Sequence, residues 1–229
     1  MLNKNKTVIW DMDGVIADTA PDHFSAWQEV FHKRGAIYTE DNFRHNFGKR
    51  NDTIIRNILG DNISQSEIEA IAVEKEENFR RQARDNVKPL PGVMELIRSL
   101  QEHGFSQALG SSAPIENIRL VTQELDIENF FQVIVSGSEV REGKPSPQGF
   151  LLAAARLGVR PQDCVVIEDS IAGVTAAKRG GMPCLAVTNT NPKARLIEAD
   201  LVVDTLEQVT VSELEGLLNR PKTETIKGA

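Results

Sequence analysis

The octapeptide at residues 8–15 (VIWDMDGV) constrains the fold of this chain more than any other stretch. Its first three residues are apolar and partly β-branched, which predicts a short buried strand. Asp11 and Asp13 follow that strand, and ligands bind at the carboxyl ends of strands in open parallel sheets. If both carboxylates lean to one face, a cation such as Mg²⁺ would offset their repulsion. The alternative is an acidic turn in which Gly14 supplies the bend.

The rest of the chain divides into a helical stretch and an alternating one. Residues 21–86 carry apolar side chains at three- and four-residue spacing, which predicts helices alone, one over 42–57 and another over 64–84. Beyond residue 88, short apolar runs alternate with helical patterns, which predicts a parallel sheet with helices on both faces. The expected strands after the first are 105–109, 133–135, 164–167, 184–187 and 201–203.

We therefore expect an α/β fold with a doubly wound, Rossmann-like core and a small inserted all-α cap. The core would comprise residues 1–17 and 88–229, and the cap residues 18–87. The polar stretch 221–229 is expected to fray.

Composition narrows the class of protein. The chain has 229 residues, of which 40% are hydrophobic and 26% charged, as in ordinary soluble globular proteins. No apolar run is long enough for a membrane span, and residues 1–6 lack the features of a signal peptide, so we expect a cytoplasmic protein. Cys164 and Cys184 lie in apolar runs, which favours two buried thiols over a disulfide or a metal pair.

The net charge of −7 disfavours nucleic acid as a partner, because no basic stripe is available to replace its counterions. A small anionic substrate would need a local positive site. We expect such a small molecule as the partner, no nucleic acid, no membrane, and a monomer or weak dimer.

Polar residues also follow the later strands, where they would converge on the cleft of Asp11 and Asp13. Ser111 and Ser112 follow the second strand, Lys144 lies near the third, and Glu168 and Asp169 follow the fourth. Each has an ordinary alternative: the serines as helix N-caps, the lysine as an exposed charge. The two carboxylates end an apolar strand, a costly place for negative charge unless a metal or a lysine neutralises it.

Three segments carry a family resemblance: residues 11–19 (DMDGVIADT), 143–145 (GKP) and 167–170 (IEDS). Together they closely resemble the signature of the haloacid dehalogenase superfamily, over nearly the whole chain. The resemblance implies phosphoryl transfer through an aspartyl-phosphate. The implied roles are nucleophile for Asp11, general acid/base for Asp13, phosphate binding for Ser111, Ser112 and Lys144, and Mg²⁺ binding for Asp11, the backbone of Asp13, Glu168 and Asp169.

Within that family, the small cap and residues 18–27 look most like the β-phosphoglucomutase branch and its related sugar-phosphate phosphatases. The resemblance implies that Thr19 lies at the cap hinge, that His23 positions Asp13, and that Lys75 contacts this region. The competing interpretation is that His23 lies on a helix surface and that residues 74–77 (EKEE) form a solvated helix face.

Two departures from the mutase pattern favour hydrolysis. The mutase follows its phosphate-binding serine with Ser-Lys-Asn, whereas residues 113–115 here are Ala-Pro-Ile. The mutase also has an arginine loop in its cap, and the corresponding residues 48–51 here are Gly-Lys-Arg-Asn. Lys49 and Arg50 therefore either hold a substrate phosphate or are surface charges on a turn. Without side chains that bind the second phosphate, a bisphosphate intermediate is held less firmly, and water competes as the acceptor of the phosphoryl group.

We therefore favour a Mg²⁺-dependent phosphatase acting on a small sugar phosphate or similar phosphate monoester. A β-phosphoglucomutase is the alternative, and a non-catalytic module that binds a phosphorylated metabolite is a further one. Dehalogenase and phosphonatase chemistry are disfavoured, because Asp13 supplies the acid that a leaving alkoxide needs.

Overall fold

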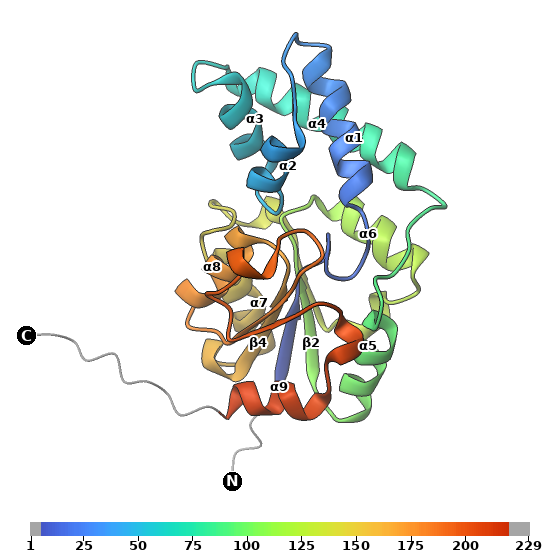
Figure 1. The fold of residues 1–229 in the computed structure, drawn as a ribbon, viewed down its shortest axis with the longest axis vertical. Coiled ribbons are helices and arrows are strands. Elements are labelled where there is room, and N and C mark those ends of the chain that lie inside the picture. Colours follow the sequence, from blue (N-terminus) through green and yellow to red (C-terminus); the bar gives the residue numbers. More distant parts are fainter. Residues whose placement is uncertain (1–5, 220–229) are drawn as a thin grey trace, which may run out of the picture.

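A computed structural model describes residues 6–219 and has at its centre a six-stranded parallel sheet (Figure 1). The strand order is β3-β2-β1-β4-β5-β6, so the chain runs outward from β1 in one direction and then in the other, and the predicted doubly wound core is confirmed. The strands are β1 (Thr7–Trp10), β2 (Ser106–Gly110), β3 (Val133–Val135), β4 (Cys164–Glu168), β5 (Cys184–Val187) and β6 (Leu201–Val203). The fray predicted for 221–229 lies outside the described residues.

Helices cover both faces of this sheet because alternate residues of each strand point to opposite sides. Val8 and Trp10 of β1 join one apolar cluster with α5, α6 and α9, while Ile9 joins another with α7 and α8. The core helices are α5 (Val93–Glu102), α6 (Ile115–Glu124), α7 (Gln148–Leu157), α8 (Ile171–Arg179) and α9 (Val211–Leu218). Short 3₁₀ turns are η1 (Glu128–Phe130), η2 (Gly137–Glu139), η3 (Pro161–Asp163), η4 (Lys193–Arg195) and η5 (Leu206–Gln208).

Four further helices form a separate layer above the carboxyl ends of the strands (Figure 1). They are α1 (Ala20–His32), α2 (Glu40–Asn46), α3 (Asn51–Leu59) and α4 (Gln65–Ala83), and we call them the cap. Their shared apolar cluster includes Trp27, Phe31 and Tyr38, so the cap has a small hydrophobic core of its own. Burial of this aromatic surface is what stabilises the layer.

The single helix predicted over residues 42–57 is wrong, because the chain turns sharply between α2 and α3. Gly48 has φ 82°, a conformation that glycine adopts without steric cost. A Cβ built at Gly48 would collide with Ser170, so the turn lies directly against the core domain. The break thus places the turn between α2 and α3 against the core.

The two chain crossings between cap and core lie side by side. Ala17 forms an antiparallel bridge with Pro89, and the backbone amide of Asp18 donates to the Lys88 carbonyl at 3.2 Å. The chain therefore enters and leaves the cap at one narrow place. We propose this position as the boundary between the cap, residues 18–87, and the core.

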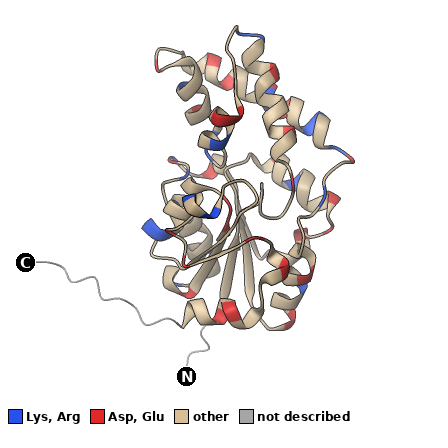
Figure 2. Ribbon diagram, viewed as in Figure 1, with Lys and Arg blue, Asp and Glu red and all other residues tan. Residues whose placement is uncertain are grey.

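Charged residues, cysteines and apolar helices are distributed as in an ordinary globular domain. Acidic and basic residues are spread over both layers (Figure 2). Cys164 and Cys184 are buried free thiols, as predicted. Within residues 6–219, none of the helices combines the length and the hydropathy needed to cross a bilayer.

Two isoleucines offer a matched test of the core. Ile97 of α5 is 0% exposed and packs in the apolar cluster on the sheet face covered by α5, α6 and α9, whereas Ile197 is 75% exposed. We expect Ile97→Ala to lower the free energy of unfolding by about 2–5 kcal/mol, since it removes buried methyl groups and leaves a cavity. Ile197→Ala should change it by less than about 0.5 kcal/mol. Urea denaturation of both variants measures the difference, and equal effects would contradict this assignment of the core.

Candidate active site

Two neighbouring strands bring buried carboxylates together at the edge of the sheet beneath the cap. Trp10 of β1 is in register with Ile167 of β4, so Asp11 and Glu168 follow side by side, and Asp169 comes next. The ammonium group of Lys144 lies between the first two, with Nζ 2.6 Å from Asp11 Oδ1 and 2.6 Å from Glu168 Oε1. The structure therefore brings together four of the residues that the sequence placed in one cleft.

Burial dominates the electrostatics of this cluster. It raises the pKa of Asp11 to about 7, helped by the negative charges of Glu168 and Asp13 and opposed by Lys144. For Lys144, burial disfavours the charged form, but the two carboxylates outweigh it and raise its pKa. Three buried carboxylates facing one ammonium leave an excess of negative charge that calls for another cation.

The donor set fits a hard divalent cation. Asp11, Glu168 and Asp169 each offer a carboxylate oxygen, and these atoms all lie within 4.8 Å of one another. Asp169 Oδ1 is buried and has no hydrogen-bond partner among the described residues, whereas its Oδ2 accepts from Thr190. A buried oxygen without a donor is costly, and a bound Mg²⁺ would satisfy it.

Glu168 differs from the other two carboxylates because its second oxygen is already satisfied. Its Oε2 accepts from the backbone amides of Asp169 and Ser170, at 2.9 and 2.8 Å, and from the Ser170 hydroxyl at 3.0 Å. Gly173 leaves room for the carboxylate, since a Cβ there would overlap it. This geometry makes Glu168 a fixed anchor for Lys144, which leaves Asp11 and Asp169 as the freer ligands.

Asp13 lies beside this cluster and is held from the cap side. The hydroxyl of Thr19 donates to Asp13 Oδ1 at 2.6 Å, and His23 Nε2 lies 3.2 Å from the same oxygen. Burial pushes the pKa of Asp13 upward, but His23 and the hydrogen bond from Thr19 outweigh it and hold that pKa below its usual value. The positions implied for Thr19 and His23 thus converge on Asp13.

Lys75 also reaches this region, so the solvated face predicted for residues 74–77 is wrong at two positions. Lys75 and Glu76 are 2% and 5% exposed, with Lys75 Nζ 2.7 Å from His23 Nδ1. His23 in turn stacks on Phe79, with ring centroids 3.9 Å apart. Lys75 is enclosed by cap side chains, whereas Glu76 accepts a hydrogen bond from Asn117 of the core.

The two serines after β2 have different surroundings. Ser111 Oγ accepts from the backbone amide of Ala113 at 3.0 Å, so its hydroxyl hydrogen remains available to a phosphate oxygen. Ser112 Oγ donates instead to the carbonyl of Gly48 at 2.7 Å, which ties the core to the turn in the cap. Of the pair, Ser111 is better placed to bind phosphate.

A chamber of about 480 Å³, a volume that includes space open to solvent, lies between the cap and these residues. Its walls combine the catalytic candidates with the aromatic side chains of the cap. They are formed by Asp11, Asp13, His23, Trp27, Tyr38, Phe43, Phe47, Gly48, Lys49, Asn51, Ile54, Lys75, Glu76, Ser111, Ser112 and Ala113.

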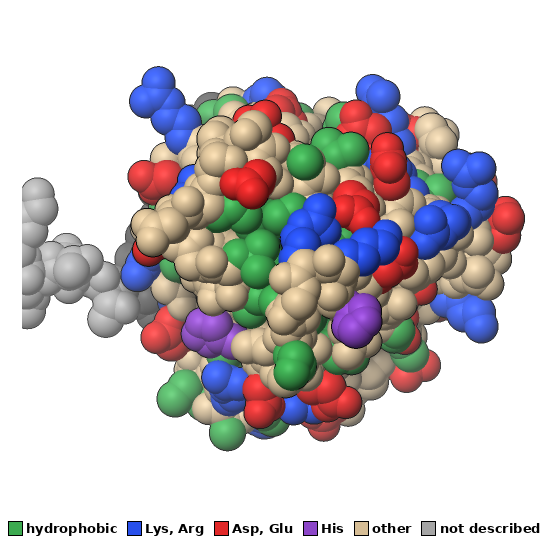
Figure 3. Space-filling view, turned by 90° about the horizontal axis from the view of Figure 1, so that it is seen from above, with side chains coloured by type: hydrophobic (Ala, Val, Ile, Leu, Met, Phe, Trp, Pro, Cys, Tyr) green, Lys and Arg blue, Asp and Glu red, His purple; other side chains and the backbone are tan. Residues whose placement is uncertain are grey.

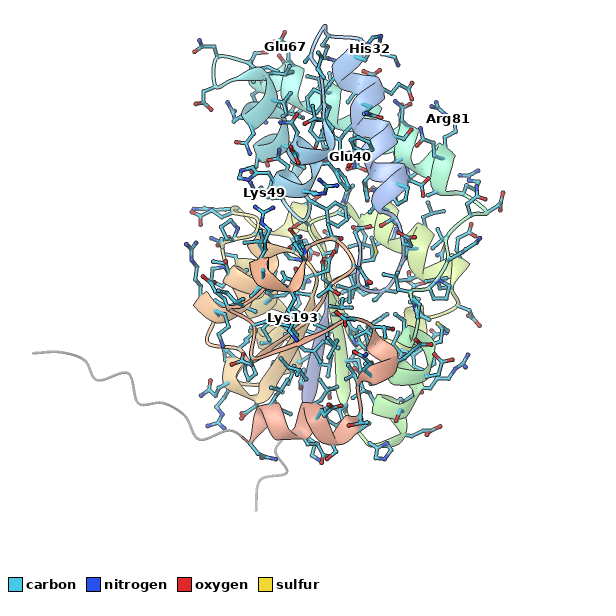
Figure 4. All side chains as sticks on the ribbon, viewed as in Figure 1. His32, Glu40, Lys49, Glu67, Arg81 and Lys193 are labelled. Carbon is cyan, nitrogen blue, oxygen red and sulfur yellow. The ribbon has the colours of Figure 1, made fainter. Side chains whose placement is uncertain are left out.

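Lys49 and Arg50, which the sequence paired, separate in space. Lys49 lines the chamber at the junction of cap and core (Figure 4), and burial lowers its pKa. Arg50 instead donates through Nη1 to the carbonyls of Val140 and Arg141, at 2.6 and 3.2 Å. Arg50 therefore fastens the cap to the core, away from the chamber wall.

Viewed from the cap end, basic and acidic side chains are interspersed with hydrophobic ones (Figure 3).

The sequence argument missed a fifth polar loop, residues 188–191 (TNTN) after β5. Thr190 donates to Asp169 Oδ2, and Asn191 Nδ2 lies 3.2 Å from the Asp169 carbonyl. Asn189 Nδ2 donates to the carbonyl of Gly14 at 2.9 Å. The rule that located the other loops, polar residues at the carboxyl end of a parallel strand, would have found this one also.

The geometry agrees with comparisons to known proteins. A family description, haloacid dehalogenase-like hydrolase, matches residues 5–181. The chain belongs to the haloacid dehalogenase-like hydrolases. It is 34% identical over 199 residues to the phosphorylated carbohydrates phosphatase of Thermotoga maritima, a match that covers 86% of this chain and 92% of the relative.

Two further members of the family carry the mutase name. A β-phosphoglucomutase of Bacillus subtilis is 34% identical over 218 residues, covering 91% of this chain and 93% of the relative. The crystal structure of a β-phosphoglucomutase from Clostridium difficile superposes with a TM-score of 0.86 at 28% identity, covering 93% of this chain and 97% of that one. Family membership is therefore clear, while phosphatase and mutase relatives are similar to the same extent.

The carboxylate cluster predicts how stability responds to pH and Mg²⁺. Because the pKa of Asp11 rises from 3.8 to about 7 on folding, the folded state binds more protons between these values, so stability falls as pH rises through that window. Mg²⁺ should restore it above pH 7, raising Tm by roughly 5–10 °C at a concentration near 100 times its Kd. At pH 5 the gain should be smaller.

Calorimetry or thermal denaturation at both pH values, with Mg²⁺ and with EDTA, measures this effect. Asp169→Asn should abolish most of the Mg²⁺-dependent shift. A shift of equal size at pH 5 and 7.5, or one that survives in Asp169→Asn, would place the ion elsewhere.

Proposed function

We propose that this chain is a Mg²⁺-dependent phosphatase that hydrolyses a small sugar phosphate through an aspartyl-phosphate on Asp11. The substrate phosphate would lie between Asp11, Ser111 and Lys144, with the sugar in the chamber beneath the cap. Bound to Asp11 and Asp169, Mg²⁺ would neutralise the phosphoryl oxygens and the nucleophile, as in other phosphoryl transfers. Lys144 adds a fixed positive charge 2.6 Å from the nucleophile carboxylate.

The two steps divide between two carboxylates. Asp11 attacks phosphorus in line, the bond to the ester oxygen breaks, and Asp13 gives that oxygen a proton. Asp13, now ionised, takes a proton from water, which attacks the aspartyl-phosphate and regenerates Asp11. Hydrogen bonds from Thr19 and His23 favour the ionised form of Asp13, and the arriving phosphate dianion favours the protonated one. Asp13 can therefore serve both steps.

The observation that carries this proposal is the scarcity of positive charge for a second phosphate. Arg50 is committed to the carbonyls of Val140 and Arg141, and Ala113 lines the chamber without a polar side chain. Among the chamber residues only Lys49 and Lys75 are cationic, and Lys75 is paired with Glu76 at 2.9 Å. Lys49 Nζ lies 3.5 Å from Asn46 Oδ1 and has no carboxylate partner among the chamber residues. One such lysine suits the hydroxyl groups or ring oxygen of a sugar monophosphate better than the second phosphate of a bisphosphate.

The similarity to the Bacillus subtilis enzyme keeps a second function in view, a β-phosphoglucomutase. That reaction would require Lys49 to hold the distal phosphate alone, or Arg50 to leave its carbonyl partners. Asp11, Asp13 and Lys144 would act in the same way, with a sugar hydroxyl in place of water as acceptor.

Product analysis separates the two functions. We expect the protein with Mg²⁺ to release free phosphate from at least one of fructose 1-phosphate, sorbitol 6-phosphate, glucose 6-phosphate and β-glucose 1-phosphate, monitored by ³¹P NMR. Asp11→Asn should lower turnover by at least about a thousandfold, since it removes the nucleophile. Glucose 6-phosphate formed from β-glucose 1-phosphate, with a trace of glucose 1,6-bisphosphate and no net phosphate release, would establish the mutase instead.

Lys49 should act on substrate binding. We expect Lys49→Ala to raise KM for the preferred sugar phosphate by about tenfold, the loss of one charge-assisted hydrogen bond, with kcat changed far less. Lys193, an exposed lysine on the core, is a matched control, and Lys193→Ala should behave as wild type. Steady-state kinetics measure both. An unchanged KM for Lys49→Ala would remove this lysine from the substrate site.

A further inference from the structure

Two adjacent charged residues of α4 are buried together inside the closed cap. Lys75 Nζ lies 2.9 Å from Glu76 Oε1, and the Asn51 amide donates to the same oxygen at 2.7 Å. Burying an ion pair costs several kcal/mol per ion before its attraction is counted, so such a pair persists only where further hydrogen bonds satisfy it. Glu76 has those bonds, and the contacts of the pair extend on one side to Asp13 and on the other to the core helix α6.

In one direction the chain of contacts ends at Asp13. An ammonium group only donates hydrogen bonds, so His23 Nδ1, 2.7 Å from Lys75 Nζ, is the acceptor. The proton of a neutral His23 is then on Nε2, from which it donates to Asp13 Oδ1 at 3.2 Å. With Thr19 also bound to Oδ1, the other oxygen of Asp13 is the one left for the substrate.

In the other direction the contacts cross from the cap to the core. Asn117 of α6 is 0% exposed, and its Nδ2 donates to Glu76 Oε2 at 2.6 Å. Its Oδ1 accepts from Arg80 Nη1 at 3.0 Å, and Arg80 lies one turn from Glu76 on α4. Two side chains of the cap thus hold both ends of a single amide of the core, which fixes the orientation of that amide.

Glu76 is also part of the wall between two cavities. Together with Asn51 and Ser112, it lines both the chamber and an outer groove that runs along α4 toward Arg80 and Glu116. Moving α4 away from α6 would remove Asn117 from Oε2 and let water reach the carboxylate from the groove. With the cap against the core, Asn117 fixes Oε2 of the same carboxylate whose Oε1 holds Lys75, so the orientation of Glu76 depends on the contact between α4 and α6.

We propose that Glu76 is a positioning residue that couples closure of the cap on Asn117 to the placement of Asp13. The inference rests on the proposed function, in which Asp13 protonates the leaving oxygen. The chain Asn117–Glu76–Lys75–His23–Asp13 sets the acid in place only when the chamber is shut. Proton transfer and exclusion of water are thereby synchronised.

Substrates with different leaving groups test the coupling. An alkoxide needs a proton from Asp13 as it leaves, whereas p-nitrophenolate is stable without one. We expect Asn117→Asp, which places a carboxylate against Glu76, to lower kcat/KM for the best sugar phosphate at least about tenfold more than for p-nitrophenyl phosphate. Glu76→Gln and Asn117→Ala should show the same imbalance between the two esters.

Glu116→Gln is the matched control, since Glu116 is the exposed neighbour of Asn117 on the same helix; both of its kcat/KM values should stay at the wild-type level. Circular dichroism establishes that each variant is folded. Equal losses for the two esters, or no loss, would overturn the coupling while leaving the phosphatase intact. A wild-type protein that hydrolyses neither ester would overturn the proposed function itself.

Discussion

The contact of Lys144 with Asp11 and Glu168 is the interaction on which the site depends. Without it, the carboxyl ends of β1 and β4 would carry adjacent buried negative charges with no ammonium group between them. The parallel register of the two strands makes this juxtaposition unavoidable, because the residues after Trp10 and Ile167 must lie side by side. A lysine from a distant loop, held 2.6 Å from both carboxylates, makes the arrangement compatible with folding.

That solution leaves an excess of negative charge at the site, and the excess favours a bound cation. Glu168 is satisfied by Lys144 and by the backbone at the start of α8, but Asp169 keeps a buried oxygen without a donor among residues 6–219. A cation placed there both completes the hydrogen-bonding and charge balance and provides the positive field that a phosphate requires. The same bound cation would therefore both stabilise the folded protein and serve catalysis.

The sequence indicated the carboxylates and the lysine of the core, but it missed the loop 188–191 and could not indicate how the cap side chains are oriented. Polar residues after apolar runs located Asp11, Lys144 and Glu168, because a parallel sheet brings its carboxyl ends to one edge whatever the details of packing. The orientation of Arg50 and the burial of Glu76 depend on how the cap helices lie on the core, and no local pattern encodes that angle. Residues 74–77 illustrate the limit, since a highly charged tetrapeptide on a helix is ordinarily solvated.

In the cap, the residues that stabilise the fold are also those that shape the chamber. Trp27, Tyr38 and Ile54 belong to its hydrophobic cluster and at the same time line the space above Asp11. An apolar wall lowers the local dielectric, which strengthens the attraction between an ammonium group and an anion relative to the same pair in solvent. A substitution that reshapes the chamber therefore also alters the packing that holds α1 against α4. Specificity in this protein can change only within the limits that the small core of the cap allows.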